Sequence, residues 1–276
     1  MSRMRTQEQK ATAFRALHER DGAFIIPNPW DAGTAKLLAA LGFEALATTS
    51  LGLANTLGRV DGRGAVSREE VLANCAQIAG ATDLPVSADL ENCYADEPRA
   101  AAQLIGLAAE AGVVGGSIED ATGDDRKPIY DFQLAVERVQ AAVETARALP
   151  FPFTLTARAE NYLHGRRDLD DTIRRLQAFE KAGANVLYAP GLRDLATIRT
   201  VVSSVGKPIN VVMSAADPTL TATQLSEIGV KRISVGGSLS RLALAYVLKA
   251  AHNMKERGDF TWMAETMPAS ELRKFF

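Results

Sequence analysis

The sequence is poor in cysteine and histidine and has no long apolar run. Only two cysteines, Cys75 and Cys93, occur in 276 residues, and we expect reduced thiols rather than one disulfide. The longest uncharged stretch, Ala45–Gly58, has 14 residues, fewer than the roughly 20 apolar residues of a membrane-spanning helix. No apolar segment typical of a secretory signal follows the first residues. These absences predict a cytoplasmic protein with no membrane partner.

Several motif classes are also missing. No apolar run is followed by GxGxxG and no GxxxxGK[ST] occurs, which argues against dinucleotide and P-loop sites. His18, His164 and His252 have no acid and nucleophile at motif spacing, and GxSxG and HExxH are absent. The 31 Lys and Arg residues and 33 Asp and Glu residues give a net charge of −2, mixed along the chain. Without a basic stripe, no nucleic-acid partner is expected.

Short apolar runs alternate with helical patterns along the chain, which is typical of βα units and a parallel sheet. Four runs follow a helix-ending glycine, at positions 42, 112, 183 and 229; three follow a proline, at 85, 152 and 208; the first begins near Ala23. The expected strands lie near 23–27, 45–49, 86–90, 115–119, 154–158, 186–189, 209–213 and 232–235. Ser67 and Thr221 begin capping-box patterns. Eight such units predict a (β/α)8 TIM-type barrel, and a doubly wound sheet is the alternative.

We expect one barrel domain over residues 1–276, in which 240–276 form a C-terminal helix and tail. The tail contains Phe260, Trp262, Phe275 and Phe276. Exposed aromatic side chains are unfavourable in a monomer, so this end is predicted to pack on a partner subunit. The alternative is that it folds back over its own barrel.

Acidic residues recur at the ends of the predicted strands, where barrel enzymes place their reactive groups. Asp61, Asp89, Glu91 and Glu119 would repel one another at one barrel mouth unless a cation lay between them. An all-oxygen site without His or Cys favours Mg²⁺, or Mn²⁺, over zinc. The alternative is that each acid caps a helix or pairs with a basic residue.

Other polar residues at the strand ends suit an anionic substrate. Arg158 ends the fifth predicted strand, where its planar head could hold a carboxylate or phosphonate, or could pair with one of the acids. Thr49 and Ser50 could cradle a second anionic group, and Asn210 lies in the seventh strand. Gly236–Ser238 could offer free N–H groups at a helix start, or could simply be a closely packed glycine pair.

Taken together, these segments resemble the isocitrate lyase and phosphoenolpyruvate mutase superfamily from about Ala23 to Arg257. The segments that carry the resemblance are Thr49-Ser50-Leu51, Leu57-Gly58-Arg59-Val60-Asp61, Pro85-Val86-Ser87-Ala88-Asp89-Leu90-Glu91, Ser117-Ile118-Glu119-Asp120 and Thr156-Ala157-Arg158-Ala159-Glu160. The resemblance implies a barrel whose C-terminal helix swaps between the subunits of a homodimer or homotetramer.

The resemblance also implies a site and a chemistry. Mg²⁺ would be held by Asp89, with Asp61, Glu91 and Glu119 around it through water. A 2-oxo acid or its enolate would bind that metal, with Arg158 and the Thr49–Ser50 segment holding the acid groups, and a C–C or P–C bond beside the enolate would be broken or formed.

The chain departs from this family at three places. Isocitrate and 2-methylisocitrate lyases carry a catalytic cysteine in the loop after the fourth strand, but here residues 120–128 contain neither Cys nor His, leaving Lys127 or Thr122 as substitutes. Glu91 replaces an Asp of the metal loop, and Cys93 replaces a glycine. Cys93 could also be a nucleophile.

The missing cysteine favours a Mg²⁺-dependent lyase or decarboxylase of the oxaloacetate decarboxylase type. Its substrate would be a small 2-oxo or 2-hydroxy di- or tricarboxylic acid. The alternatives are P–C bond chemistry on phosphonopyruvate, and a barrel that binds a keto acid with little turnover.

Overall fold

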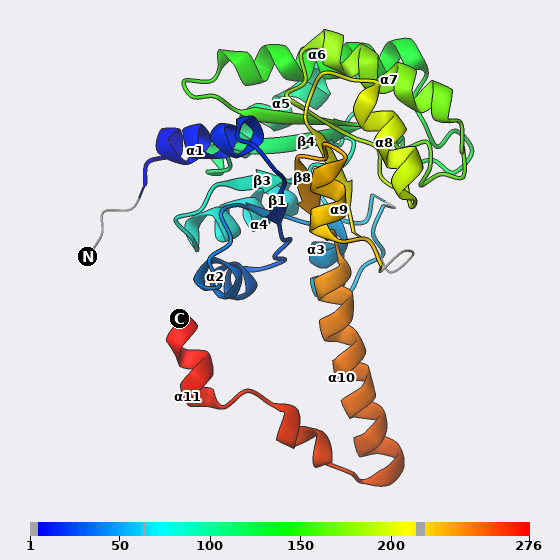
Figure 1. The fold of residues 1–276 in the computed structure, drawn as a ribbon. Helices are drawn as coiled ribbons and strands as arrows, with labels where there is room; N and C mark the ends of the chain where they lie inside the picture. Colours follow the sequence, from blue (N-terminus) through cyan, green and yellow to red (C-terminus); the bar gives the residue numbers. More distant parts are fainter. Residues whose placement is uncertain (1–4, 63, 214–218) are drawn as a thin grey trace.

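A computed structural model describes residues 5–62, 64–213 and 219–276 (Figure 1). The start of the chain, where the sequence predicts no secretory signal, includes Met1–Met4, which lie outside the described residues. The eight strands are β1 Phe24–Ile26, β2 Leu46–Ala47, β3 Val86–Ala88, β4 Gly115–Glu119, β5 Thr154–Arg158, β6 Val186–Tyr188, β7 Ile209–Val212 and β8 Arg232–Ser234. All paired neighbours are parallel, in the order β1-β8-β7-β6-β5-β4-β3-β2. The predicted (β/α)8 barrel is confirmed.

The gap between β1 and β2 is bridged just beyond the strands. The Ala47 N–H donates to the Pro27 carbonyl at 3.1 Å, which links the two end strands of the sheet. This bond places the residues after β1 and β2 side by side at the carboxyl end of the barrel. The carboxyl ends of all eight strands therefore surround one mouth.

Helices follow the strands and cover the outside of the barrel. They are α2 Ala32–Ala40, α3 Ser50–Thr56, α4 Arg68–Gly80, α5 Pro98–Glu110, α6 Phe132–Ala148, α7 Leu169–Ala182, α8 Leu195–Ser203 and α9 Ala222–Glu227. The capping boxes at Ser67 and Thr221 are formed as predicted. Gly183 ends α7 in the left-handed conformation, with φ 107°, which glycine adopts at little cost.

The helix α3 begins directly after β2, at Ser50. The Thr49 side chain caps α3 by accepting from the Gly52 N–H at 3.4 Å. A Cβ on Gly52 would lie 2.7 Å from Trp30 Cβ, so the helix can start this close to the residues after β1 only with glycine there. This tight turn positions Ser50 at the barrel mouth.

The helix α1, Gln7–Glu19, packs across the opposite, amino end of the barrel. Phe14 is fully buried there, and a Cβ on Gly115 would lie 2.9 Å from its ring. His18 is also buried, between the rings of Phe14 and Phe24. The amino end is thus closed by packed aromatic side chains.

The C-terminal helix α10, Ser238–Arg257, projects away from the barrel (Figure 1). It exposes large apolar side chains, among them Leu242, Leu244, Tyr246, Val247 and Leu248. The chain then turns through the short helices η1 Thr261–Glu265, α11 Ala269–Leu272 and η2 Arg273–Phe275. The last residue, Phe276, returns to α2, where its ring lies 5.9 Å from Lys36 Nζ. The tail therefore touches its own barrel, while most of α10 does not.

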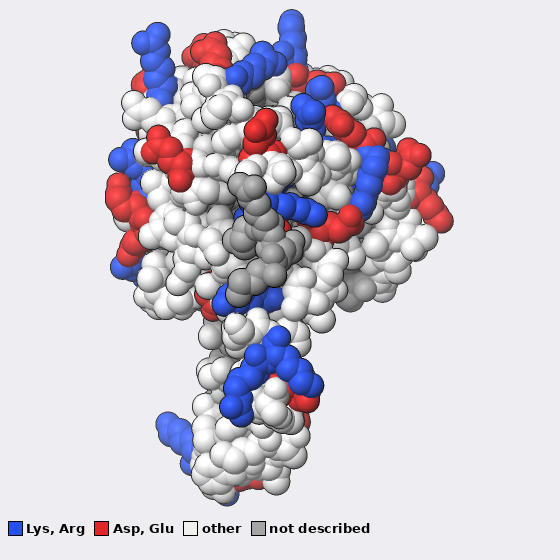
Figure 2. Space-filling model, turned by 90° about the vertical axis from the view of Figure 1, so that its left-hand side faces the viewer, with Lys and Arg blue, Asp and Glu red and all other residues white. Residues whose placement is uncertain are grey.

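Figure 2 shows Lys and Arg interspersed with Asp and Glu on the face it presents, without a continuous basic area. No helix among the described residues is long and apolar enough to cross a membrane.

Candidate functional site

A cavity of about 180 Å³ opens at the carboxyl end of the barrel. Of the residues singled out in the sequence, it is lined by Thr49, Ser50, Asp61, Asp89, Arg158, Asn210, Gly236 and Gly237. The further polar residues that line it are Asn28, Thr48, Ser87, Ser117, Tyr188, Arg232 and Ser234. Residues from each of the eight described strands, or from the segments that follow them, thus meet at one place, as expected for a barrel mouth.

Arg158, at the end of β5, is surrounded by three carboxylates. Its Nη1 lies 2.9 Å from Asp89 Oδ1, its Nη2 lies 3.0 Å from Glu119 Oε2, and its Nε lies 2.8 Å from Glu160 Oε1. Although burial lowers the pKa of Arg158, the charges of Glu160, Glu119 and Asp89 raise it. The ion pairs that the sequence left as an alternative role for Arg158 are therefore present.

Asp89 is held from several sides. Its Oδ2 accepts from the Ser50 N–H at the start of α3, at 3.1 Å, and its own N–H donates to Thr48 Oγ1 at 2.8 Å. The Ser50 hydroxyl donates to Asp61 Oδ2 at 3.4 Å. The Ser50 N–H, which the sequence offered to a substrate anion, thus holds a carboxylate, and Asp61 and Asp89 are brought together through Ser50.

Glu91 lies on the strained loop that follows β3. Glu91, Cys93 and Tyr94 have φ of 49°, 58° and 56°, in the left-handed region that favours glycine. The Tyr94 hydroxyl donates to Glu91 Oε1 at 2.5 Å. On the outer side the buried Arg138 guanidinium donates to the carbonyls of residues 92, 95 and 96. These bonds hold the loop in its strained conformation, and they keep Glu91 next to Asp89.

The surroundings of these acids disfavour their ionised, negatively charged forms. Burial raises the pKa of Asp61, and the Asp89 charge raises it further. Burial also raises the pKa of Glu91 to about 7 and that of Glu119 well above its ordinary value, against the opposing effect of Arg158 on Glu119. One guanidinium therefore does not neutralise the group, and a divalent cation with a preference for oxygen ligands fits this excess of carboxylate. Among the described residues, no group of three or more His, Cys, Asp or Glu side chains is already arranged to hold a metal ion.

Gly236 and Gly237 have different roles from the one first considered. The N–H groups of Val235 and Gly236 both donate to Asn28 Oδ1, at 3.0 and 2.9 Å. A Cβ on Gly237 would lie 2.4 Å from Leu51 Cδ2, so this glycine allows α3 and α10 to pack closely. The close-packing alternative holds for Gly237, and the Gly236 N–H is bonded to Asn28. No short motif marks Asn28, which follows β1 by two residues.

A row of polar side chains crosses the barrel interior beneath the mouth. Arg232 Nε donates to Asn210 Oδ1 at 2.8 Å, its Nη2 donates to Thr156 Oγ1 at 3.0 Å, and Asn210 Nδ2 donates to Ser234 Oγ at 3.1 Å. The Tyr188 ring lies 5.1 Å from Arg158 Cζ. Arg232 and Ser234 are two apart on β8 and so face the same side, a periodicity that could have revealed Arg232 in the sequence.

The other reactive residues considered in the sequence lie away from the cavity. Lys127 pairs with Asp131 at 2.6 Å, and the Thr122 hydroxyl donates to the Lys127 carbonyl at 2.5 Å, so neither reaches the mouth. Burial raises the pKa of the Cys93 thiol to about 12, which removes the thiolate that a nucleophile needs. Cys75 is buried in the core as expected, and both thiols are free.

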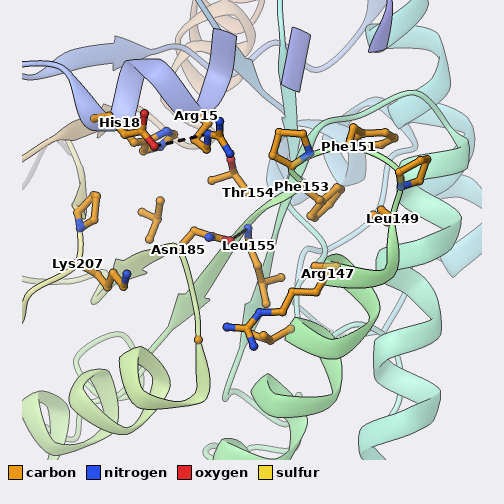
Figure 3. A pocket seen from close by; sticks show the side chains of 18 residues that line it. Arg15, His18, Arg147, Leu149, Phe151, Phe153, Thr154, Leu155, Asn185 and Lys207 are labelled. Atoms are coloured by element: carbon orange, nitrogen blue, oxygen red, sulfur yellow. Dashed lines mark hydrogen bonds and ion pairs between the residues drawn. The ribbon is translucent and has the colours of Figure 1, made fainter. Parts of the chain in front are cut away.

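A larger cavity, of about 570 Å³, lies at the amino end of the barrel (Figure 3). It is lined by Thr154 and Val186, which begin β5 and β6, and by Arg147, Lys207 and His18. None of the clustered acids contributes to it. The converging charges therefore point to the smaller cavity as the candidate active site.

Comparison with known proteins agrees with this geometry. The family model of phosphoenolpyruvate phosphomutase matches residues 14–255. The chain belongs to this family. An uncharacterized protein of Mycobacterium tuberculosis is 31% identical over 264 residues, 95% of each chain. The 2-methylisocitrate lyase of Escherichia coli is 29% identical over 77% of this chain and 73% of its own, and the oxaloacetate decarboxylase of Pseudomonas paraeruginosa is 27% identical over 95% and 89%.

Solved structures of family members share the barrel. A candidate lyase/mutase from Burkholderia cenocepacia is 57% identical over 98% of this chain and 96% of its own, with a TM-score of 0.95. The 2,3-dimethylmalate lyase, a member of the PEP mutase/isocitrate lyase superfamily, is 26% identical over 99% and 95%, with a TM-score of 0.85. Phosphonopyruvate hydrolase, solved with oxalate and Mg²⁺, has the same fold at 21% identity over 98% and 95%, with a TM-score of 0.86.

These relatives confirm the superfamily that the sequence resembled and the expected class of enzyme. Members with a named activity include carbon–carbon lyases, such as 2-methylisocitrate lyase and 2,3-dimethylmalate lyase. The superfamily also contains phosphonopyruvate enzymes. The chain therefore belongs to an enzyme superfamily that includes carbon–carbon lyases and phosphonopyruvate enzymes.

Proposed function

We propose that the protein is a Mg²⁺-dependent lyase or decarboxylase that cleaves a C–C bond of a small 2-oxo or 2-hydroxy di- or tricarboxylic acid. The observation that carries the proposal is the group of acids around Arg158. One guanidinium does not balance their negative charge. The 2-methylisocitrate lyase and oxaloacetate decarboxylase relatives, at 29% and 27% identity, support this class of reaction.

The residues that would hold the metal are the four acids at the strand ends. Asp89 is proposed as the direct ligand of Mg²⁺, or of Mn²⁺, with Asp61, Glu91 and Glu119 around the ion through water. Asp89 and Asp61 line the cavity, Glu119 is paired with Arg158, and Glu91 lies close enough to Asp89 for their charges to interact. When bound, the ion supplies a Lewis acid that stabilises the oxyanion developing on an enolate. The raised pKa values of Asp61, Glu91 and Glu119 are the expected electrostatics of such a site before a cation neutralises it.

The chain's own residues would bind and orient the acid. Arg158 is proposed to hold its carboxylate, and Thr49, Ser50, Asn210 and Gly236 to line the pocket around it. Among the described residues of the 120–128 loop, no acidic or basic side chain lines the cavity. Decarboxylation fits this arrangement, because the C–C bond would break to give CO₂ and an enolate, and the enolate can take its proton from water rather than from a side-chain acid.

The P–C alternative keeps one specific support, the matching phosphoenolpyruvate phosphomutase family model.

The two reactions are separated by a product assay with mass spectrometry. The purified chain is incubated with oxaloacetate, 2-methylisocitrate, 2,3-dimethylmalate, phosphonopyruvate or 2-oxoglutarate, each with Mg²⁺ and with EDTA. We expect EDTA-sensitive turnover of one C–C substrate. Phosphate released from phosphonopyruvate alone would move the protein to the alternative, and binding of a keto acid without any product would leave only a binding barrel.

We also propose that the apolar side chains of α10 pack on a second copy of the chain, in a homodimer or homotetramer with swapped helices. Val247 and Leu248 are 63% and 61% exposed although they are apolar. Val247→Asp should shift the assembly toward monomer in analytical ultracentrifugation, whereas Lys255→Glu, also exposed on α10, should not. A wild-type chain that is monomeric at micromolar concentration would contradict this proposal.

A further inference from the structure

Arg232, the first residue of β8, is a buried cation inside the barrel. Only 6% of its surface is exposed, and its side chain lines the carboxyl-end cavity. Two of its nitrogens donate to neutral oxygens, Asn210 Oδ1 and Thr156 Oγ1. Its third nitrogen, Nη1, is buried and has no hydrogen-bond partner among the described residues.

The two arginines that line this cavity are neutralised very differently. Arg158 meets a carboxylate with each of its three nitrogens, from Asp89, Glu119 and Glu160. Arg232 has no ion pair with an acid among the residues that the structure describes. The cation of the cavity that lacks an anion is therefore Arg232 and not Arg158.

A buried guanidinium without an anion is unfavourable, because its charge is desolvated and no opposite charge compensates it. Burial lowers the pKa of Arg232 to about 10, and the Arg158 charge acts in the same direction. The side chain is nevertheless protonated near pH 7. Because Arg232 lines the cavity, an anion bound there can approach it and supply the missing charge and hydrogen bond.

We propose that Arg232 binds a second anionic group of the substrate and so restricts this enzyme to small dianions. The inference rests on the proposed function: one acid group lies with Arg158 and the acid cluster, and the other reaches Arg232 deeper in the barrel. The cavity of about 180 Å³ suits a small acid, because drug-sized ligands occupy roughly 300–1,000 Å³. The second group is a carboxylate in the C–C reaction and a phosphonate in the P–C alternative.

Binding calorimetry with Mg²⁺ tests this inference on three probes. 2-Oxoglutarate carries a second carboxylate, phosphonopyruvate carries a phosphonate, and 2-oxobutyrate carries neither. We expect the wild type to bind at least one dianion about tenfold or more tightly than 2-oxobutyrate, the range of a charge-assisted hydrogen bond. In Arg232→Met that dianion should weaken about tenfold or more, while 2-oxobutyrate should stay within about twofold. Which dianion responds distinguishes the carboxylate from the phosphonate.

Two further variants separate binding from structure. Thr156→Val removes a hydrogen bond to the same guanidinium but keeps its charge, and should keep the dianion preference. Arg232→Lys keeps the charge without the planar fork, and should reduce the preference about threefold or more. If Arg232→Met does not fold, this lysine variant decides the question. Equal weakening of all three probes, or no dianion preference in the wild type, would overturn the inference.

The outcome for the proposed function is read separately, from turnover of the wild type. If the wild type turns over one of the acids and Arg232→Met keeps the dianion preference, the role of Arg232 is refuted and the lyase proposal stands. Loss of the dianion preference in Arg232→Met, together with a wild type that turns over none of the acids, would support the role of Arg232 and refute the lyase proposal. A wild type that binds none of the probes would overturn both.

Discussion

The two ends of the barrel contain cavities that differ in size and in charge. At the carboxyl end about 180 Å³ is lined by polar groups, including the half-buried Asp89 and Arg158 and the buried Arg232. At the amino end about 570 Å³ is lined by aromatic and aliphatic side chains with Arg147 and Lys207, both exposed (Figure 3). None of the clustered acids lines the larger cavity.

The comparison shows that a cluster of charged side chains identifies the candidate active site better than the volume of a cavity does. At the carboxyl end, acids from three strands share one guanidinium, and burial raises the pKa of Glu91 to about 7. Such clustering is costly for stability and is found where chemistry requires it. Residues at the amino face of a barrel more commonly serve stability. Substitutions at the two ends should therefore affect different quantities.

The largest effect is expected from Asp89→Ala at the carboxyl end. Removing the proposed metal ligand should abolish Mg²⁺ binding and lower kcat/KM about 10³-fold or more, because the ion supplies several kcal/mol of transition-state stabilisation. Calorimetry with Mg²⁺ and the product assay measure both effects. Asp170→Ala, an exposed acid in the first turn of α7, is the control and should change neither. Full metal-dependent turnover in Asp89→Ala would remove this residue from the site.

Arg158→Lys is the second largest expected change. A lysine ammonium offers one point of charge where Arg158 now contacts three separate carboxylates, so at least one of them is left without its partner. We expect kcat/KM to fall about 10²-fold and the free energy of unfolding to fall by about 3 kcal/mol. Steady-state kinetics and urea denaturation measure the two quantities. Near-normal kinetics would show that Arg158 does not contact the substrate.

Much of the architecture could be predicted because it depends on local signals. Glycine or proline before the apolar run located seven of the eight described strands to within about two residues, and the apolar run near Ala23 located the first, since helix ends and strand starts have their own backbone requirements. The acids after β3 and β4 were then placed at one mouth by the geometry of a parallel barrel alone. The α3 helix was missed because its start depends on close packing of Gly52 against Trp30.

The internal partners in the site could not be predicted, because they join residues far apart in the chain. The Arg158–Asp89 pair spans 69 residues, and the bond from Arg232 to Thr156 spans 76. A sequence pattern shows that Arg158 ends a strand, but not that three carboxylates already occupy its nitrogens. Arg232 carries no motif, and its significance follows only from the missing anion beside it.

His18 lies at the amino end, and its titration should change the stability of the protein rather than its turnover. Burial lowers the pKa of His18 to about 3, with Arg232 adding to the shift, against 6.5 in the unfolded chain. The folded protein keeps His18 neutral, so its contribution to stability is complete above pH 6.5 and is lost as pH falls below that value. Between pH 6.5 and 5 this group alone should remove about 2 kcal/mol, at 1.36 kcal/mol per pH unit. Urea denaturation at pH 7 and 5 should show this loss in the wild type and a smaller one in His18→Phe. An equal loss in both would show that His18 does not titrate on unfolding.

The smallest effect is expected from the cations of the amino-end cavity. Arg147→Ala and Lys207→Ala each remove an exposed charge from the larger cavity, far along the barrel from Asp89. If catalysis depends on the converging acids and not on cavity size, both variants should keep kcat and KM within about twofold and stability within about 0.5 kcal/mol, the usual range for surface substitutions. The product assay and urea denaturation check both quantities. A tenfold loss of turnover in either variant, with stability unchanged, would mean that the amino end takes part in the reaction, and the contrast between the two ends would no longer hold.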